Sequence, residues 1–462
     1  MRELKKILLW MLVVSMIVVF SLVGCKPAEE VAPAEEVTPA EEEVAEEEVA
    51  EEETALAETI TFWAMPNAPA EAHLAWMEEK AAAFLAETGI TVNFEEVGWG
   101  DAWPKISAAL IEQTADVSQV GTTWNPQFAA TDGLLELNMD EFGGADAFIA
   151  ANLESCTLGG KYYGVPWFAE TRCLFYNKDM FAEAGATPPT TWDELVAAGE
   201  KIVAQYGEGK AISMAGTGAW DLIHNFAALL WQNGGSLLNE DNTEATLNSP
   251  EGVEAMVFYI NLLAKGLADP ACAEYNQPQA DAAFIAGNVA MCVMGPWNIS
   301  GIMADNPTLN YGVIELPVGP TGIKGAFSGG SNLVIFANSE HKEAAKKWVN
   351  YLISDDVLLS YTNKDISNMI PASLSCLADP YYQTPEMQTF ITGLGYATAY
   401  PPLGVWGDIE NATVGEFKNV LTAYIDMTTG YVTKEVTQEE IEQIAQDALN
   451  SAAVKINEAL AK

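Results

Sequence analysis

An acidic and a basic residue stand two positions apart in an aromatic-rich stretch, Trp167-Phe-Ala-Glu170-Thr-Arg172-Cys-Leu-Phe-Tyr176. Arg172 is one of only two arginines in the chain, and the other is Arg2. In an extended strand, residues two apart point to the same face, so we expect Glu170 and Arg172 to lie side by side. Two interpretations stay open: Arg172 pairs with Glu170, or it offers its planar fork of donors to the hydroxyl groups of a ligand.

Tryptophans are concentrated near Gly, Pro and Asn, which are residues of turns. An indole face buries the apolar face of a sugar ring, while Asn, Asp, Glu and Arg satisfy the ring hydroxyls. Core packing is the competing interpretation for each single tryptophan. The tryptophans near turn residues are Trp63, Trp99, Trp103, Trp124, Trp167, Trp231, Trp297 and Trp406. So many at turns predict a concave site for a neutral sugar.

Signatures of catalysis are few. The chain has no H-E-x-x-H, G-x-S-x-G or G-x-x-x-x-G-K-[ST] motif, and its three histidines, His73, His224 and His341, read as surface or core residues. No C-x-x-C or His-bearing cluster indicates a metal site. A glycosidase needs only two carboxylates, but no motif selects a pair among the 65 acidic residues. We therefore expect a binding protein without catalysis, cofactor or metal.

The net charge of −44 argues against partners that are polyanions. Nucleic acid and anionic lipid surfaces are both bound through Lys and Arg. A small anionic ligand would also need convergent cations, and the loops of interest offer little beyond Lys161 and Arg172. A polyamine, held by carboxylates and tryptophan faces, or a peptide remains an alternative to a sugar.

The first 24 residues have the composition of an export signal. Basic residues precede the apolar run 7–23, which ends in Leu22-Val-Gly-Cys25. This ending resembles the lipobox of bacterial lipoproteins, which implies cleavage before Cys25 and acylation of its thiol. An uncleaved membrane anchor is the alternative, because the apolar run is near the minimum length of a spanning helix. Both interpretations place the body outside the cytoplasm.

Residues 25–58 form a low-complexity segment of Pro, Ala and Glu. After Lys26, Glu is its only charged residue, and aromatic residues are absent. Such a segment repels itself and builds no core, so we expect an extended tether. Five cysteines follow it, and disulfides are chemically allowed outside the cytoplasm. Because five is odd, we favour small buried apolar thiols for Cys156, Cys173, Cys272, Cys292 and Cys376.

From Thr59 onward, strand-like and helical patterns alternate. Strands are expected at 59–63, 91–97 and 117–122, and helices at 70–88, 103–113, 251–265 and 341–354. On the first helix, the apolar stripe consists of Leu74, Met77, Ala81, Phe84 and Leu85. Thr191 and Thr437, each followed three residues later by Glu, are expected to cap helices. The alternation predicts an α/β fold with mixed, mainly parallel sheets flanked by helices.

The body resembles family 1 of the extracellular solute-binding proteins of ABC importers, the group that includes the maltose-binding protein, over about residues 59–460. Four stretches carry the resemblance. They are Tyr163-Gly-Val-Pro166 with Tyr176-Asn-Lys-Asp-Met-Phe181, Trp231-Gln-Asn-Gly-Gly235, Ala283-Phe-Ile-Ala-Gly-Asn-Val-Ala-Met291 with Gly295-Pro-Trp297, and Gly329-Gly-Ser-Asn-Leu-Val-Ile335. The resemblance implies the two-lobed type II fold of periplasmic binding proteins, whose lobes are joined by a multi-strand hinge and close on the ligand. One lobe is expected at 59–170 plus 328–375, and the other at 171–327 plus 376–462.

The resemblance also implies a ligand site in the cleft between the lobes. Glu170 matches a glutamate that contacts sugar hydroxyls, Trp297 and Trp406 match stacking aromatics, and Trp124 and Asn125 lie in a ligand-contacting loop. At Trp124 the maltose binder has an acidic residue, so maltose itself is not expected. The further candidates are Trp63, Met65, Trp167, Arg172, Trp231, Gly329 and Ser331.

The implied function is that of a monomeric sugar receptor, anchored by lipid on Cys25 in the periplasm or at the cell surface. It would deliver a neutral mono- or oligosaccharide to the transmembrane subunits of an ABC permease.

Overall fold

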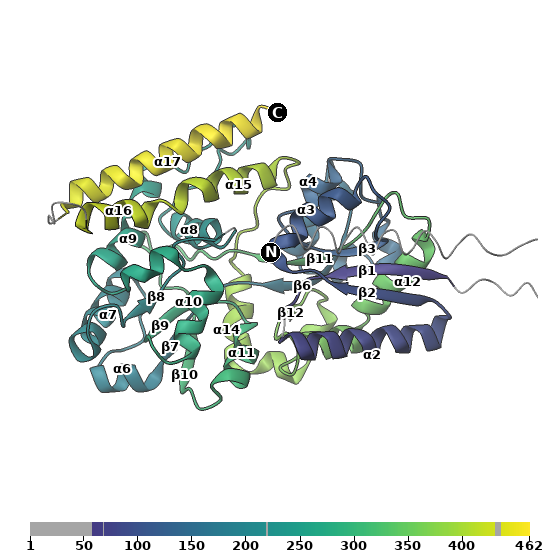
Figure 1. Cartoon of the computed structure of the whole chain (residues 1–462), viewed down its shortest axis with the longest axis horizontal. Helices are drawn as coiled ribbons and strands as arrows, with labels where there is room; N and C mark the ends of the chain where they lie inside the picture. The colour runs from purple at the N-terminus through teal and green to yellow at the C-terminus, as the bar shows by residue number, and fades with distance from the viewer. Residues whose placement is uncertain (1–57, 68, 219, 430–435) are drawn as a thin grey trace, which may run out of the picture. The chain divides into compact units, whose positions relative to one another are not determined.

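The computed structural model describes residues 58–67, 69–218, 220–429 and 436–462 (Figure 1). The described residues from Glu58 onward belong to one compact unit. The expected signal segment, Cys25 and nearly all of the expected tether lie outside the described residues. Within the described part of the chain, no helix combines the length and the hydrophobicity that crossing a membrane requires.

The first sheet has six strands in the order β12-β6-β11-β3-β1-β2. Their bounds are β1 Thr59–Ala64, β2 Thr91–Glu96, β3 Val117–Gly121, β6 Val165–Glu170, β11 Gly329–Ile335 and β12 Ile370–Pro371. Strand β1 pairs in parallel with β2 and β3, whereas β11 is antiparallel to β3 and β6, and β12 is antiparallel to β6.

The second sheet has four strands in the order β10-β7-β9-β8. Their bounds are β7 Cys173–Asn177, β8 Ile212–Ser213, β9 Met291–Met294 and β10 Tyr311–Ile314. Only the β8–β9 pair is parallel among the described pairs of this sheet. A separate hairpin pairs β4 (Thr157–Leu158) with β5 (Lys161–Tyr162).

The expected mixed sheets are confirmed, but parallel pairs are the minority among the described pairs of each sheet. The reason lies in the chain path. Strand β6 leads directly into β7 of the second sheet, and β11 brings the chain back to the first sheet, where it runs against both of its neighbours. Strands β1, β2 and β3 are parallel because helical crossovers connect them. Strand β11 enters the first sheet from the second sheet, so no such crossover fixes its direction.

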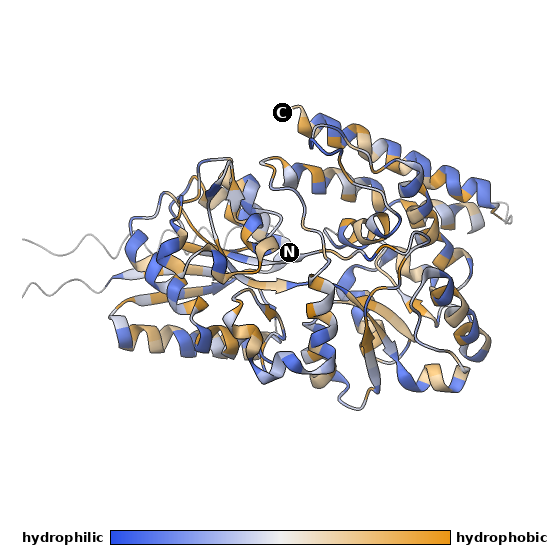
Figure 2. Cartoon of the chain, turned by 180° about the vertical axis from the view of Figure 1, so that it is seen from behind, coloured by the Kyte–Doolittle hydropathy of each residue, from blue (hydrophilic) through white to orange (hydrophobic). Residues whose placement is uncertain are grey.

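Helices cover both sheets, as the alternating pattern predicts. Figure 2 shows hydrophobic colour along the strands and mixed colour around the helices, as expected when one helix face packs inward. Helices around the first sheet are α2 Ala70–Thr88, α3 Trp99–Ala109, α4 Asn125–Ala129, α5 Ala150–Ser155, α12 Lys342–Ile353 and α13 Asp355–Thr362. The others are α6 Lys178–Ala184, α7 Trp192–Tyr206, α8 Asp221–Gln232, α9 Pro250–Ala264, α10 Gln277–Ile285, α11 Asn298–Asp305, α14 Pro385–Leu394, α15 Trp406–Phe417, α16 Val420–Thr429 and α17 Gln438–Leu460.

Local signals predict several helix ends well. Helix α2 has the expected bounds, and Gly89 ends it with a φ of 74°. The Thr191 hydroxyl accepts a hydrogen bond from the backbone of Glu194, and Thr437 forms a full capping box. Helix α3 begins earlier than expected, at Trp99, with Gly98 as its N-cap.

The expected stripe on α2 is only partly right. Leu74 and Leu85 are 40% and 42% exposed, and His73 and Trp76 are buried in their place. The ring of Trp76 packs on Tyr361 of α13, so the face of α2 that is buried is set by aromatic partners far along the chain.

The cysteines that follow the tether agree with the favoured interpretation. All five are buried and unpaired in the structure. Burial raises the pKa of Cys156 and Cys292 well above the usual value, so both thiols stay protonated.

Candidate ligand-binding cleft

A cavity of about 340 Å³ lies among segments attached to both sheets. The first sheet contributes the carboxyl-terminal ends of β1, β3 and β6 and the loops that follow them. Helices α8, α10 and α11, which belong to the second half of the fold, contribute side chains near their amino-terminal ends. Loops at the carboxyl ends of strands commonly form ligand sites in α/β folds. We call this cavity the cleft.

Arg172 lies at the centre of a buried polar network in the cleft. Its Nε donates to Glu170 Oε2 at 3.3 Å, and its Nη2 donates to Asp221 Oδ1 at 2.9 Å. The guanidinium also lies over the ring of Trp297, with Cζ 4.9 Å from the ring centroid. Because only 6% of Arg172 is exposed, this network is fixed by its partners rather than by solvent.

The same burial shifts the pKa values of the ionisable groups in this network. Burial raises the pKa of Glu170, although Arg172 partly offsets the effect. Burial also lowers the pKa of Arg172, but Glu170 and Asp221 more than compensate, so its pKa rises and it stays charged. Arg172 thus holds two carboxylates in place, which is the first of the two interpretations of the Glu170–Arg172 pair.

A third acid, Asp281 of α10, also faces the cleft. Its oxygens accept hydrogen bonds from Gln277 Nε2 at 2.7 Å and Asn298 Nδ2 at 2.9 Å. Burial raises the pKa of Asp281 to about 7, against these two donors and Arg172. Near neutral pH it therefore carries only part of a charge.

Tryptophans supply the apolar surface of the cleft. Trp124 lies in contact with Trp220, at a centroid distance of 4.9 Å, and with Trp99 at 5.8 Å. All three line the cleft, as does Trp297. Trp124 is almost fully buried, whereas the other three are partly exposed and so present ring surface that a ligand can cover.

Residues 68–358 match the family described as bacterial extracellular solute-binding proteins. The chain belongs to this family. The solute-binding protein is 32% identical to a binding protein of Brucella abortus over 355 residues, which is 75% of this chain and 84% of the relative. It is 31% identical to the diacetylchitobiose binding protein of Streptomyces coelicolor over 308 residues, which is 64% of this chain and 70% of the relative.

Solved structures agree with this assignment. An ABC transporter solute-binding protein from Thermotoga lettingae, bound with alpha-D-tagatose, is 26% identical and has a TM-score of 0.76, covering 87% of this chain and all of that one. The GacH receptor of Streptomyces glaucescens is also 26% identical, with a TM-score of 0.73 and coverage of 86% and 99%. The expected family and the two-lobed α/β fold class are confirmed, and these relatives are binding proteins rather than enzymes.

The structure brings five of the residues expected in the ligand site of the solute-binding protein into the cleft wall. They are Trp124, Glu170, Arg172, Trp297 and Ser331. Gly329 lies beside the wall: a Cβ there would come within 2.5 Å of Glu170 Oε1, so glycine leaves room for that carboxylate.

Other expected site residues do not line the cleft. On β6, Phe168 and Glu170 line the cleft, whereas Trp167 does not and stacks on Tyr361 with a centroid distance of 4.7 Å. Trp63 and Met65, at the end of β1, are buried in a hydrophobic cluster with Phe336.

Three more expected residues do not line the cleft. Asn125 opens α4 and is fully buried beneath Gly164. Trp406 opens α15 and stacks on Tyr400 at 4.5 Å. Trp231 lies on α8 and contacts the same tyrosine. All three lie near turns, but their side chains pack against other parts of the protein.

Sequence reasoning missed several cleft residues. Those not chosen are Asn67, Trp99, Trp220, Asp221, His224, Gln277, Asp281 and Phe327. Trp99 was among the tryptophans noted near turns but was not chosen as a site residue. Trp220 and Asp221 follow the Gly-rich stretch at 216–218, and this turn composition could have marked them as candidates. Gln277 and Asp281 carry no sequence signal, because their place depends on how α10 packs.

Proposed function

We propose that this solute-binding protein is the extracytoplasmic substrate-binding subunit of an ABC importer, which binds a neutral mono- or oligosaccharide in the cleft and delivers it to the permease. The observation that carries the proposal is the pairing of tryptophan surface with a buried polar network. Trp99, Trp220 and Trp297 offer ring faces next to the hydrogen-bonding groups of Arg172 and Asp221. This combination suits a molecule with apolar faces and a hydroxyl-bearing edge.

The charge balance of the cleft supports a neutral ligand. Among the described residues that line the cleft, Arg172 is the only Lys or Arg, and its charge is already matched by Glu170 and Asp221. An anionic ligand would therefore lie close to two carboxylates, and the only cationic side chain in the described wall would already be paired with them. A polyamine is the second candidate, because the wall holds three acids for one arginine and several tryptophan faces.

Further parts of the proposal concern the chain outside the cleft. We propose lipid attachment at Cys25, on the basis of Leu22-Val-Gly-Cys25, with residues 25–58 as the tether. The lobes are proposed at 59–170 plus 328–375 and at 171–327 plus 376–462. This division is supported by the end of β6 at Glu170 and the start of β7, in the other sheet, at Cys173. Closure of the lobes would exclude water from the ligand.

A ligand panel tests the proposal. The full chain, purified in a detergent without a sugar headgroup, is melted in the presence of mono- and disaccharides, maltooligosaccharides, spermidine and a tripeptide. A ligand that binds only the folded state stabilises it by about 2.7 kcal/mol at a hundred times its Kd. At least one neutral sugar should raise the melting temperature. If spermidine or the peptide raises it and no sugar does, the sugar proposal fails.

Catalysis is tested on the same preparation. Oligosaccharides that bind are incubated with the protein and analysed for shorter products. We expect them to be recovered intact, and release of a shorter product at a rate proportional to protein concentration would instead indicate a glycosidase.

A further inference from the structure

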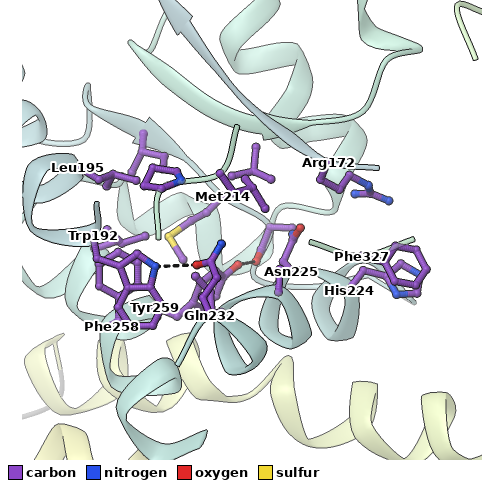
Figure 3. Close-up of a pocket in the computed structure, with 18 of the residues that line it drawn as sticks. Arg172, Trp192, Leu195, Met214, His224, Asn225, Gln232, Phe258, Tyr259 and Phe327 are labelled. Carbon is purple, nitrogen blue, oxygen red and sulfur yellow. Dashed lines mark hydrogen bonds between the residues drawn. The ribbon is translucent and has the colours of Figure 1, made fainter. Parts of the chain in front are cut away.

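A second, smaller chamber adjoins the cleft. It measures about 70 Å³ and lies between α7, α8, α9 and strands β8 and β9. Figure 3 shows Trp192 and Phe258 at one end, and Arg172, His224 and Phe327 at the other. Arg172, His224, Phe327 and Gln277 line both the chamber and the cleft. The chamber is therefore a lateral extension of the cleft, which is the proposed ligand site.

Most of the chamber wall is apolar or aromatic. Trp192, Met214, Phe258 and Leu262 belong to it, and the Trp192 indole is already satisfied by Gln232 Oε1 at 2.8 Å. Apart from Ser213, whose buried Oγ has no hydrogen-bond partner among the described residues, this half of the wall offers apolar surface, so we expect an apolar group to occupy it.

An unmatched donor stands at the end next to the cleft. Arg172 uses Nε for Glu170 and Nη2 for Asp221, but its Nη1 is buried and has no hydrogen-bond partner among the described residues. Buried donors without partners are rare in folded proteins and call for a specific explanation. A ligand oxygen that accepts from Nη1 supplies one.

An unmatched acceptor lines the same chamber, on α8. Gln277 Nε2 donates to Asp281 and to the carbonyl of Val293, so Gln277 Oε1 must be the atom that faces Asn225. Asn225 Nδ2 donates a hydrogen bond to Gln277 Oε1 at 3.1 Å. This leaves Asn225 Oδ1 buried and without a partner among the described residues. The orientation of the Asn225 amide is thus fixed by its neighbours.

We propose that this chamber binds the acetamido group of a 2-acetamido sugar whose ring occupies the cleft. The carbonyl oxygen accepts from Arg172 Nη1, the amide N–H donates to Asn225 Oδ1, and the methyl group enters the apolar part. The inference rests on the proposed sugar-binding function and narrows its substrate class. By the measure in which one water needs about 10–15 Å³, a chamber of about 70 Å³ has room for the few heavy atoms of an acetyl group.

Other common sugar substituents match this wall less well. A hydroxyl group can both accept and donate a hydrogen bond, but it leaves the apolar part of the chamber unfilled. A carboxylate can accept from Arg172 but places negative charge against Asn225 Oδ1. An ammonium group can donate to Asn225 Oδ1 but places positive charge against Arg172. Only a secondary amide offers an acceptor, a donor and an apolar end together.

The experiment compares matched sugars by calorimetry on the full chain. N-acetylglucosamine, N-acetylgalactosamine and diacetylchitobiose are each set against the parent hydroxyl sugar and the free amino sugar of the same skeleton. A methyl-sized group in a fitted apolar pocket changes affinity by about 10–200-fold. We expect the acetamido form to bind at least tenfold more tightly than both of its matched partners.

Two variants locate the effect. Asn225→Ala removes the acceptor, and Ala228→Leu fills the chamber from α8; neither residue lines the cleft. Each should reduce the ratio of the affinities for the acetamido sugar and its parent sugar by about tenfold. Asn261→Ala on α9, outside both cavities, is the matched control and should leave the preference unchanged. Melting curves show whether each variant is folded.

The outcomes separate the two proposals. If sugars bind but the acetamido form gains nothing, or if both chamber variants are folded and keep the full preference, the chamber assignment is overturned while the sugar-binding function stands. If no sugar binds the full chain, both proposals fail.

Discussion

Glu410 of α15 provides a stringent test of the electrostatic reasoning. The carboxyl is fully buried, and Thr123, whose side chain belongs to the cleft wall, donates a hydrogen bond to its Oε2 at 3.1 Å. Burial raises the pKa of Glu410 from 4.5 to about 8, although Thr123 and Trp406 act in the opposite direction. The folded protein therefore keeps a proton at neutral pH that the unfolded chain releases.

The sign and the size of the effect follow from linkage. Because the pKa is higher in the folded state, the protonated carboxyl favours folding fully below pH 4.5, and this contribution is lost as pH rises toward 8. At about 1.4 kcal/mol per pH unit, it falls by about 3 kcal/mol between pH 4.5 and pH 7. Glu410→Gln keeps the shape and an acceptor for Thr123 but cannot ionise, so it escapes this loss.

The assay is urea unfolding of the wild type and Glu410→Gln at pH 5, 6, 7 and 8. Other titrating groups act equally on both proteins and cancel in the difference between them. The variant should gain stability relative to the wild type by about 2.5 kcal/mol between pH 5 and pH 7. Glu442→Gln, the same substitution at an exposed position on α17, is the control, and its difference from the wild type should not change with pH.

A flat difference for Glu410→Gln across this pH range would refute the reasoning. It would mean that the carboxyl ionises in the folded protein at its ordinary pKa, with water or a partner that the contacts described above do not include. A variant that is less stable at every pH by the same amount would instead indicate lost packing.

The remaining predictions concern the cleft and its surroundings. Trp297→Ala should weaken binding of any sugar ligand by about 2 kcal/mol, or roughly thirtyfold in Kd by calorimetry, because it removes a ring face next to Arg172; an unchanged Kd would remove Trp297 from the site. Arg172→Met should cost about 3–5 kcal/mol in urea unfolding, since Glu170 is left buried without its cation; wild-type stability would contradict this. Trp406→Ala should cost a similar amount, about 3–5 kcal/mol, through a core cavity. Its Kd, measured well below the melting temperature, should stay within twofold, and a larger change would place Trp406 in contact with ligand.

Sequence patterns predicted the local structure and the family well. The period of α2, its terminal glycine and the Thr191 and Thr437 caps act within a few residues, so they can be read without knowing the rest of the chain. The Glu170–Arg172 contact was also predicted from the two-residue spacing, and it forms although β6 ends at Glu170 and Arg172 lies in the link to β7.

What could not be predicted depends on contacts between distant segments. Trp124 and Trp406 both follow turns, yet one faces the cleft and the other packs on Tyr400, and the choice is made by the helices around them. Asp221 reaches Arg172 across 49 positions of the chain, and no spacing rule connects the two. The antiparallel entry of β11 between β3 and β6 has the same origin.

Two of the links between the sheets differ in length, and under the proposed two-lobe division this has a mechanical consequence. Strand β6 ends at Glu170 and β7 begins at Cys173, whereas the return from β10 to β11 runs through residues 315–328 (Figure 1). If the proposed lobes close on a ligand, the shorter link would allow the least relative displacement and so would act as the pivot. A small rotation moves groups near a pivot little and groups far from it much. Glu170 and Arg172, which lie at the shorter link, would then keep their positions while groups farther from the link converge on the ligand.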